Sequence, residues 1–143
     1  MFKVKTDIEK NRLYITISGM FHYTEAEKAK EQIETEVAAL QPGFDLINDI
    51  SKFIRGEDEG GKILQEIMLI LIKNKVNRVI RVVGTSKTGL IQFANYTLPI
   101  ESYNLKYVPT LDEAEKLLDK KENEQGQKDT GPESKETEPE PKE

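Results

Sequence analysis

The sequence predicts one α/β domain in the order β-β-α-β-α-β-α-β-α, with a mixed, mostly parallel sheet covered by helices. Two observations lead to this prediction. The chain opens with two segments that alternate apolar and polar residues, and strand-like runs then alternate with segments of helical length. Strands that are separated by helices pair in parallel, whereas the opening pair is close enough to form an antiparallel hairpin at the sheet edge.

The first elements are a hairpin and a helix. Residues 2–6 and 13–18 alternate as half-buried strands do, and the charged connection between them contains Asn11. Residues 24–27 then form a predicted capping box, with Thr24 as the N-cap and Glu27 bonding back to its N–H. The helix ends at Pro42-Gly43, and its apolar face at helical spacing consists of Ala26, Ala29, Ile33, Val37 and Leu40.

Strands and helices alternate through the rest of the domain. Residues 44–50 form a short apolar strand, 63–72 a very apolar helix and 78–83 a strand rich in β-branched residues. A third helix is predicted from about 87 to 96, followed by a last strand at 105–108. A second capping box, residues 110–113, opens the final helix, whose apolar residues are Leu111, Ala114, Leu117 and Leu118.

The end of the chain differs sharply in composition from the rest. Residues 122–143 contain eight acids and three lysines but no aliphatic, aromatic or sulfur-containing side chain, so the sequence predicts a domain at 1–121 and a disordered acidic tail at 122–143. The tail accounts for the whole net charge of −5. The domain itself is neutral, and therefore offers no electrostatic basis for binding nucleic acid or an anionic membrane.

Other compositional features narrow the class of protein. The chain has no cysteine, which excludes disulfides, thiol nucleophiles and thiolate metal sites. The charged beginning of the sequence does not resemble a signal peptide, and the apolar run at 67–72 is too short to span a bilayer. We therefore expect a cytoplasmic protein without membrane insertion.

Two segments resemble a known family. Residues 15–26 (ITISGMFHYTEA) look like a strand, a glycine-centred turn and the Thr-Ala-type start of a helix, and residues 44–51 (FDLINDIS) look like a central strand. Over residues 2–120 the chain resembles the STAS domain of bacterial anti-sigma-factor antagonists and of the cytoplasmic parts of sulphate transporters. The divergent sporulation-factor-AA-like relatives are the closer match. The resemblance implies a STAS-like fold and a small regulatory, protein-interaction module.

An acidic, glycine-rich segment, residues 56–61, departs from the family pattern. In phospho-regulated members an Asp-Ser-Ser-Gly-like stretch follows the central strand, and a partner kinase phosphorylates its serine. The matching residues here are Glu57, Asp58, Glu59 and Gly60, without a hydroxyl, and the nearest hydroxyl, Ser51, is expected directly after the strand. Because a carboxylate carries about one negative charge and phosphoserine about −1.5 to −2, Glu59 would only partly imitate a phosphorylated residue.

The apolar helix at 63–72 suggests where a partner binds. Its predicted sheet-facing stripe is Ile63, Ile67, Ile70 and Leu71, which leaves Met68, Leu69 and Ile72 to be covered by something else. A neighbouring helix, a partner protein, a second copy in a weak homodimer, or an apolar ligand would each provide that cover. The predicted partner-binding residues are Glu57, Asp58, Glu59, Gly60, Met68, Leu69 and Ile72.

Residues 84–89 have the glycine spacing of a phosphate-binding loop. Leu90 and Ile91 follow, however, where that loop requires Lys and Ser/Thr, so a nucleoside triphosphate site is disfavoured. The remaining alternatives are an ordinary helix cap and a weaker anion site built from Gly84, Thr85, Ser86 and Lys87.

No enzyme chemistry emerges from the motifs. His22 is the only histidine and no serine lies in a Gly-x-Ser-x-Gly elbow, so we assign no catalytic residue and expect a loop-packing histidine. The adjacent acids Glu57, Asp58 and Glu59 lack EF-hand spacing, and no metal or cofactor is predicted. The sequence thus predicts a non-enzymatic interaction module. The alternative is a carrier or sensor of a small apolar or anionic ligand, held between the second and third helices.

Overall fold

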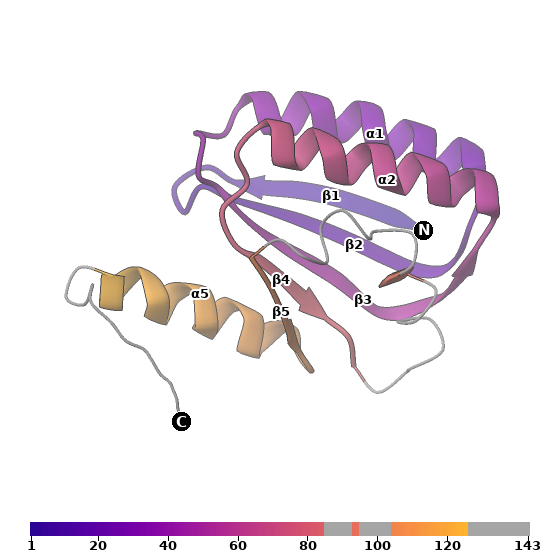
Figure 1. The fold of residues 1–143 in the computed structure, drawn as a ribbon. Coiled ribbons are helices and arrows are strands. Elements are labelled where there is room, and N and C mark those ends of the chain that lie inside the picture. Colours follow the sequence, from indigo (N-terminus) through magenta and orange to yellow (C-terminus); the bar gives the residue numbers. More distant parts are fainter. Residues whose placement is uncertain (85–92, 95–103, 126–143) are drawn as a thin grey trace, which may run out of the picture.

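Five strands form one sheet in the order β1-β2-β3-β4-β5 (Figure 1). The computed structural model describes residues 1–84, 93–94 and 104–125. β1 pairs antiparallel with β2, and every other pairing is parallel, so the predicted mixed sheet with an antiparallel edge is confirmed. The described elements are β1 Phe2–Asp7, β2 Arg12–Phe21, α1 Tyr23–Ala38, β3 Asp45–Gly56, α2 Asp58–Lys73, β4 Val79–Val82, β5 Leu105–Val108 and α5 Leu111–Gln125.

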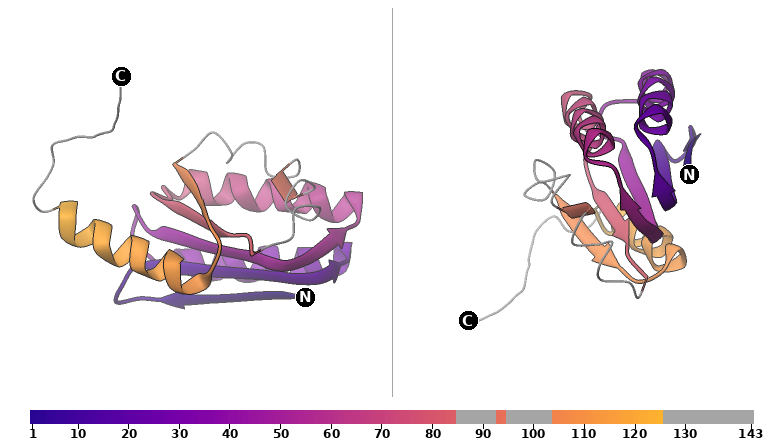
Figure 2. Two further views of the ribbon diagram at one scale, coloured as in Figure 1. Left: turned by 90° about the horizontal axis from the view of Figure 1, so that it is seen from below. Right: turned by 90° about the vertical axis from the view of Figure 1, so that its right-hand side faces the viewer.

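The helices cover the two faces of the sheet unequally. α1 and α2 lie side by side over one face, and α5 lies across the other (Figures 1 and 2). The larger core lies under α1 and α2 and is built from the alternate residues of β2 and β3, such as Leu13, Ile15 and Leu46. α5 packs chiefly on β3, β4 and β5, where a smaller cluster consists of Ile47, Ile80, Val82, Ala114 and Leu118. Much of β1 and β2 on this second face is therefore outside the cover of α5.

β2 and β3 are longer than predicted. β2 continues past Ser18 to Phe21, and β3 continues past Ile50 to Gly56, so Ser51 lies within a strand and not after it. The register between the two strands shifts twice, and Gly19, at φ +66°, lies at the second shift. Such irregularities break the apolar–polar alternation, and this is why the sequence signal ended too early.

The predicted capping box at Thr24 is wrong. α1 begins two residues earlier than predicted, at Tyr23, and its N-cap position is His22, which makes no side-chain capping bond. Glu27 accepts a hydrogen bond from the Tyr23 hydroxyl at 2.7 Å. The backbone N–H of Tyr23 donates to Glu57 instead, 34 residues away in sequence. A tertiary contact has thus replaced the local cap.

The second helix also begins earlier than predicted, inside the acidic, glycine-rich segment at 56–61. β3 runs to Gly56 and α2 begins at Asp58, so Glu57 alone separates them and both Gly60 and Gly61 lie inside the helix. Asp58 and Glu59 lie in the first turn of α2, where negative charge is favourable.

The last helix starts as predicted. The Thr110 hydroxyl oxygen accepts the N–H of Glu113 at 3.2 Å, which is the N-cap bond of the second capping box. Ala114 and Leu118 are buried, but Leu111, predicted to be on the apolar face, is 45% exposed. α5 extends to Gln125, four residues beyond the predicted domain boundary at 121. The predicted third helix lies outside the described residues except for Phe93 and Ala94. No described helix combines the length and apolar character that crossing a membrane requires.

Candidate functional site

The ends of β2 and β3 and the starts of α1 and α2 meet at one end of the molecule. A hollow of about 410 Å³ lies there, lined by Met20, Phe21, His22, Arg55, Gly56 and Glu57. The strands bring these residues together because Met20 pairs with Arg55 and Phe21 pairs with Gly56 in the parallel β2–β3 ladder.

Phe21 explains why glycines stand at this junction. A Cβ atom at Gly56 would lie 2.3 Å from the ring of Phe21, and one at Gly60 would lie 2.5 Å from it. Neither distance is sterically tolerable, so the ring occupies the space that side chains at these two positions would need. Phe21 is buried and also contacts the rings of Phe2 and Phe53, with centroids 5.4 and 5.6 Å away. The glycine-rich sequence therefore reflects close packing.

Glu57 links the starts of both helices. It occupies the N-cap position of α2, its Oε1 accepts the Tyr23 N–H of α1 at 2.8 Å, and its Oε2 lies 3.2 Å from His22 Nδ1. The backbone hydrogen bond from Tyr23, and then the bond to His22, lower the pKa of the Glu57 carboxyl. His22, expected to pack in a loop, is exposed and contacts this carboxylate.

Exposed apolar side chains surround this junction. Ile54 is 60% exposed, Met20 47% and Tyr23 40%, whereas most large apolar side chains of the described part of the chain are buried. Asp58 and Glu59, in the first turn of α2, are exposed as well. We call this set the α2-start surface; it consists of Met20, Tyr23, Ile54, Glu57, Asp58 and Glu59.

The structure separates the residues that the sequence grouped into one site. Glu57, Asp58 and Glu59 lie on the α2-start surface, but Gly60 is buried against Phe21. Met68, predicted to need outside cover, is fully buried, because α1 lies beside α2. Ile72 is half-buried against the core, and only Leu69 is largely exposed, at 53%. Ile70, predicted to face the sheet, is only half-buried.

Sequence reasoning missed Met20 and Ile54. Both lie in the extensions of β2 and β3, which the sequence pattern did not predict because the register between the strands is irregular there. The signal that could have found them is an apolar residue directly beyond a glycine or beside a basic residue at a strand end, as in Gly19-Met20 and Ile54-Arg55.

The candidate anion site at Gly84, Thr85, Ser86 and Lys87 lies outside the described residues except for Gly84. The N–H of Gly84 donates to the carbonyl of Pro109 at 3.2 Å, so this N–H already has a hydrogen-bond partner within the protein. In the described part of the chain, no three His, Asp or Glu groups lie close enough to hold a metal ion.

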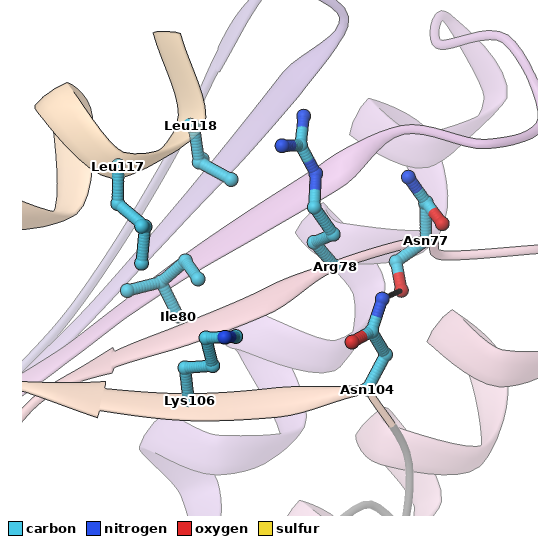
Figure 3. A pocket seen from close by; sticks show the side chains of 7 residues that line it. All are labelled: Asn77, Arg78, Ile80, Asn104, Lys106, Leu117 and Leu118. Atoms are coloured by element: carbon cyan, nitrogen blue, oxygen red, sulfur yellow. Dashed lines mark hydrogen bonds between the residues drawn. The ribbon is translucent and has the colours of Figure 1, made fainter. Parts of the chain in front are cut away.

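A second hollow, of about 120 Å³, lies between β4, β5 and α5 (Figure 3). Arg78 and Lys106 both line it, but the guanidinium of Arg78 extends away from the ammonium group of Lys106. Arg78 is held by Asp45 through two hydrogen bonds, from Nε at 3.0 Å and from Nη2 at 2.7 Å. Asn104 is likewise held, by donating to the carbonyl of Asn77. These residues join β3, β4 and β5 and do not converge on a ligand.

The strand order and the helix placement define a divergent STAS-like fold, as the sequence predicted. The anti-sigma factor antagonist SpoIIAA in its unphosphorylated form superimposes with a TM-score of 0.57 at 15% identity, over 83% of this chain and 98% of that one. An uncharacterised protein with a SpoIIAA-like fold from Shewanella loihica gives 0.62 at 13% identity, over 82% and 92%. An anti-sigma factor antagonist from Mycobacterium paratuberculosis gives 0.54 at 21% identity, over 83% and 93%.

No family model matches the sequence, and no curated protein matches it. The similarity to known proteins therefore concerns the fold.

Proposed function

We propose that the protein is a non-enzymatic regulatory module that binds a protein partner through the α2-start surface. The observation that supports this is the exposure of Met20 and Ile54 at the ends of β2 and β3, where Met20 and Glu57 line one hollow and the chain continues into the acidic start of α2. Apolar side chains next to fixed charges are typical of the centre and rim of a protein interface. Two of the proteins with a similar fold are described as anti-sigma factor antagonists, which is a role in protein interaction.

The partner surface should be apolar with a basic rim. Ile54 and Met20 would provide the desolvated contact, and Asp58 and Glu59 would pair with Lys or Arg side chains of the partner. Because residues 57–60 contain no hydroxyl, the charge at this position is permanent, and Glu59 would set the affinity without a phosphorylation step there. Binding would then be regulated by the amount of partner or of this protein.

Charge reversal tests the proposal. Tagged wild-type protein and the variants Ile54→Lys and Glu59→Lys are used to recover proteins from a lysate of the source organism, which are quantified by mass spectrometry. Glu34→Lys is the matched control, because Glu34 is an exposed acid on α1 outside the α2-start surface. We expect one or more proteins to be retained by wild type and Glu34→Lys and lost from both surface variants. Equal recovery by all four proteins would contradict the proposal.

Self-association through α2 is a weaker alternative than the sequence suggested. Of the three residues predicted to be uncovered there, Leu69 alone is largely exposed. The surface area of one such side chain is far smaller than the approximately 800 Å² per partner that a stable interface buries. The predicted ligand site between the second and third helices involves residues outside the described part of the chain, and no observation on the described residues favours it.

A further inference from the structure

A groove crosses the face of the sheet that α5 leaves partly open. It has a volume of about 320 Å³ and lies between the edge strand β1, the middle of β2 and β3, and the first turns of α5. Two rows of paired residues form its floor. One row is Lys5, Tyr14 and Ile47, and the next is Lys3, Thr16 and Asp49. We call it the β1–α5 groove.

Charges of opposite sign face each other across this groove. Lys3 and Lys5 lie on β1, and neither makes an ion pair with any described residue. Lys5 Nζ lies 4.9 Å from the centre of the Tyr14 ring. On the other side, Asp49 uses its Oδ1 to accept the N–H and the hydroxyl of Ser51, and no described residue pairs with its charge.

The floor between these charges is apolar and fixed in place. The hydroxyl of Tyr14 donates to the carboxylate of Glu115 at 2.9 Å, which holds the ring against the sheet. Glu115 is itself paired with the fully buried Arg12, so its charge is compensated within the protein. Ile47 is buried beside Tyr14, and Leu111, 45% exposed, forms a wall from α5.

We propose that the β1–α5 groove binds a free α-amino acid with an apolar side chain. The carboxylate of the ligand pairs with Lys3 and Lys5, its ammonium group pairs with Asp49 and Thr16, and its side chain lies on Tyr14, Ile47 and Leu111. The proposal uses none of the residues of the α2-start surface and does not depend on the function proposed above.

The dimensions of the groove agree with such a ligand. β1 and β3 are two strand spacings apart, or roughly 10 Å. This spacing separates the backbones, and the flexible four-carbon stems of Lys3 and Lys5 let their ammonium groups reach the carboxylate of a small ligand that lies between the strands. The volume is at the lower end of the range for small-molecule sites, as expected for a ligand of this size.

A simple anion and a simple cation fit less well. An anion with an apolar body would pair with the lysines, but the like charge of Asp49 would repel it. A cation would pair with Asp49, but the two lysines would repel it. When an analogue lacks the group that pairs with a charge of the site, that charge stays unpaired in the complex. The analogue then binds more weakly than the complete ligand. Three probes that share one apolar body therefore test the proposal: L-phenylalanine, 3-phenylpropionate without the amine, and phenethylamine without the carboxylate.

The test is a titration of the full-length protein, labelled with ¹⁵N, with each probe, followed through the backbone amide signals. We expect L-phenylalanine to shift the amides of the groove rows in a saturable manner, and we expect each analogue to bind at least about tenfold more weakly. L-leucine serves as a second amino acid. The proposal is overturned if neither amino acid gives saturable shifts at millimolar concentration, or if 3-phenylpropionate binds as tightly as L-phenylalanine.

Variants tie the binding to the groove. Lys3→Gln with Lys5→Gln removes the cations, and Asp49→Asn removes the anion while leaving an oxygen for Ser51. Each should weaken L-phenylalanine binding at least about tenfold. The matched control is Lys28→Gln with Lys62→Gln, two exposed lysines on the helices of the other face. A control that weakens binding as much as the groove variants would also overturn the proposal, and the amide spectrum shows directly that each variant is folded.

Discussion

A single side chain, that of Glu57, connects two helix starts that the sequence places 35 residues apart. Its carboxylate accepts the N–H of Tyr23 in α1 while it occupies the N-cap position of α2. The local pattern at residues 24–27 indicated a self-contained cap, but the helix begins at Tyr23, and the charged carboxylate of Glu57 accepts the unpaired N–H there. The general position of the acidic residues was predictable, but their hydrogen-bond partners were not.

The Glu57 contact makes stability depend on pH in the acidic range. The pKa of Glu57 in the folded protein is lower than its ordinary value of 4.5, so the carboxylate contributes stability above that value and loses it as the pH falls through the folded-state pKa. We expect wild type to be more stable than Glu57→Gln at neutral pH, and the difference to shrink below pH 4.5. Urea denaturation of both proteins across pH measures this. A difference that stays constant at low pH would show that the charge of Glu57 is not responsible.

Gly56 provides a steric test at the same junction. In Gly56→Ala the new Cβ would lie 2.3 Å from the ring of Phe21, so we expect a loss of roughly 1–3 kcal/mol in the free energy of unfolding. Gly60→Ala should cost less, because alanine stabilises a helix interior by about 1 kcal/mol relative to glycine. Chemical denaturation measures both.

A second-site change shows whether the clash is the cause. Phe21→Leu added to Gly56→Ala should cost less than the sum of the two single changes, since the smaller side chain vacates the contested space. Strict additivity of the two effects would argue against a steric origin.

At the scale of whole elements, α5 is anchored to the sheet by a buried cation. Arg12 on β2 is fully buried and donates to Glu115 and to Asp119 of α5. Burial alone would lower the pKa of Arg12, but hydrogen bonds with Asp119, Tyr14 and Glu115 raise it overall, so the cation persists. The apolar contribution beneath α5 is small, and this polar network compensates for it. No periodicity in the sequence could reveal it, because Arg12 and Asp119 are far apart along the chain.

Removing one acid from this network should destabilise the protein. Glu115→Ala leaves Arg12 with Asp119 as its described carboxylate partner, and we expect a loss of about 1–3 kcal/mol, because a buried charge loses a hydrogen bond. The control is Asp112→Ala, which breaks an exposed pair with Lys116 on the same helix and should cost about 0.5 kcal/mol or less. Thermal and chemical unfolding compare the two variants. Equal losses would mean that the buried network does not anchor α5.

α2 offers a second test at this scale. Leu69→Lys places a charge at a largely exposed position and should leave stability almost unchanged, whereas Ile72→Lys disturbs a half-buried contact with the core and should cost about 1–2 kcal/mol. Denaturation measures the difference, and analytical ultracentrifugation of wild type and Leu69→Lys shows whether Leu69 supports self-association. If Ile72→Lys were as stable as wild type, the burial of this side chain would be in doubt.

At the scale of the whole molecule, the sequence predicted the architecture better than the site. The alternation of strands and helices, the antiparallel edge and the buried face of α1 followed from periodicity, because a chain of this length can bury these faces in few ways. The face of α2 could not be resolved in the same manner. When six apolar residues follow one another, a helix has no unique polar side, and only the position of α1 decides that Met68 is buried and Leu69 is not.

The composition of the sequence and the end of α5 together indicate where the domain ends. Residues 122–143 contain no apolar side chain that could offset the entropy of ordering them, but α5 includes the first four of these residues and ends at Gln125. We therefore place the dispensable segment after 125 and not after 121. A protein of residues 1–125 should unfold within about 3 °C of the full-length chain, a shift that corresponds to less than about 1 kcal/mol for a domain of this size.

The comparison with residues 1–121 separates the two boundaries. Removing residues 122–125 as well takes the last turn from α5, so this shorter protein should lose helical signal in circular dichroism and melt no higher than the 1–125 protein. Differential scanning calorimetry of the three proteins under one buffer condition measures the melting temperatures. A fall of more than about 5 °C on removing residues 126–143 would show that the acidic segment stabilises the domain.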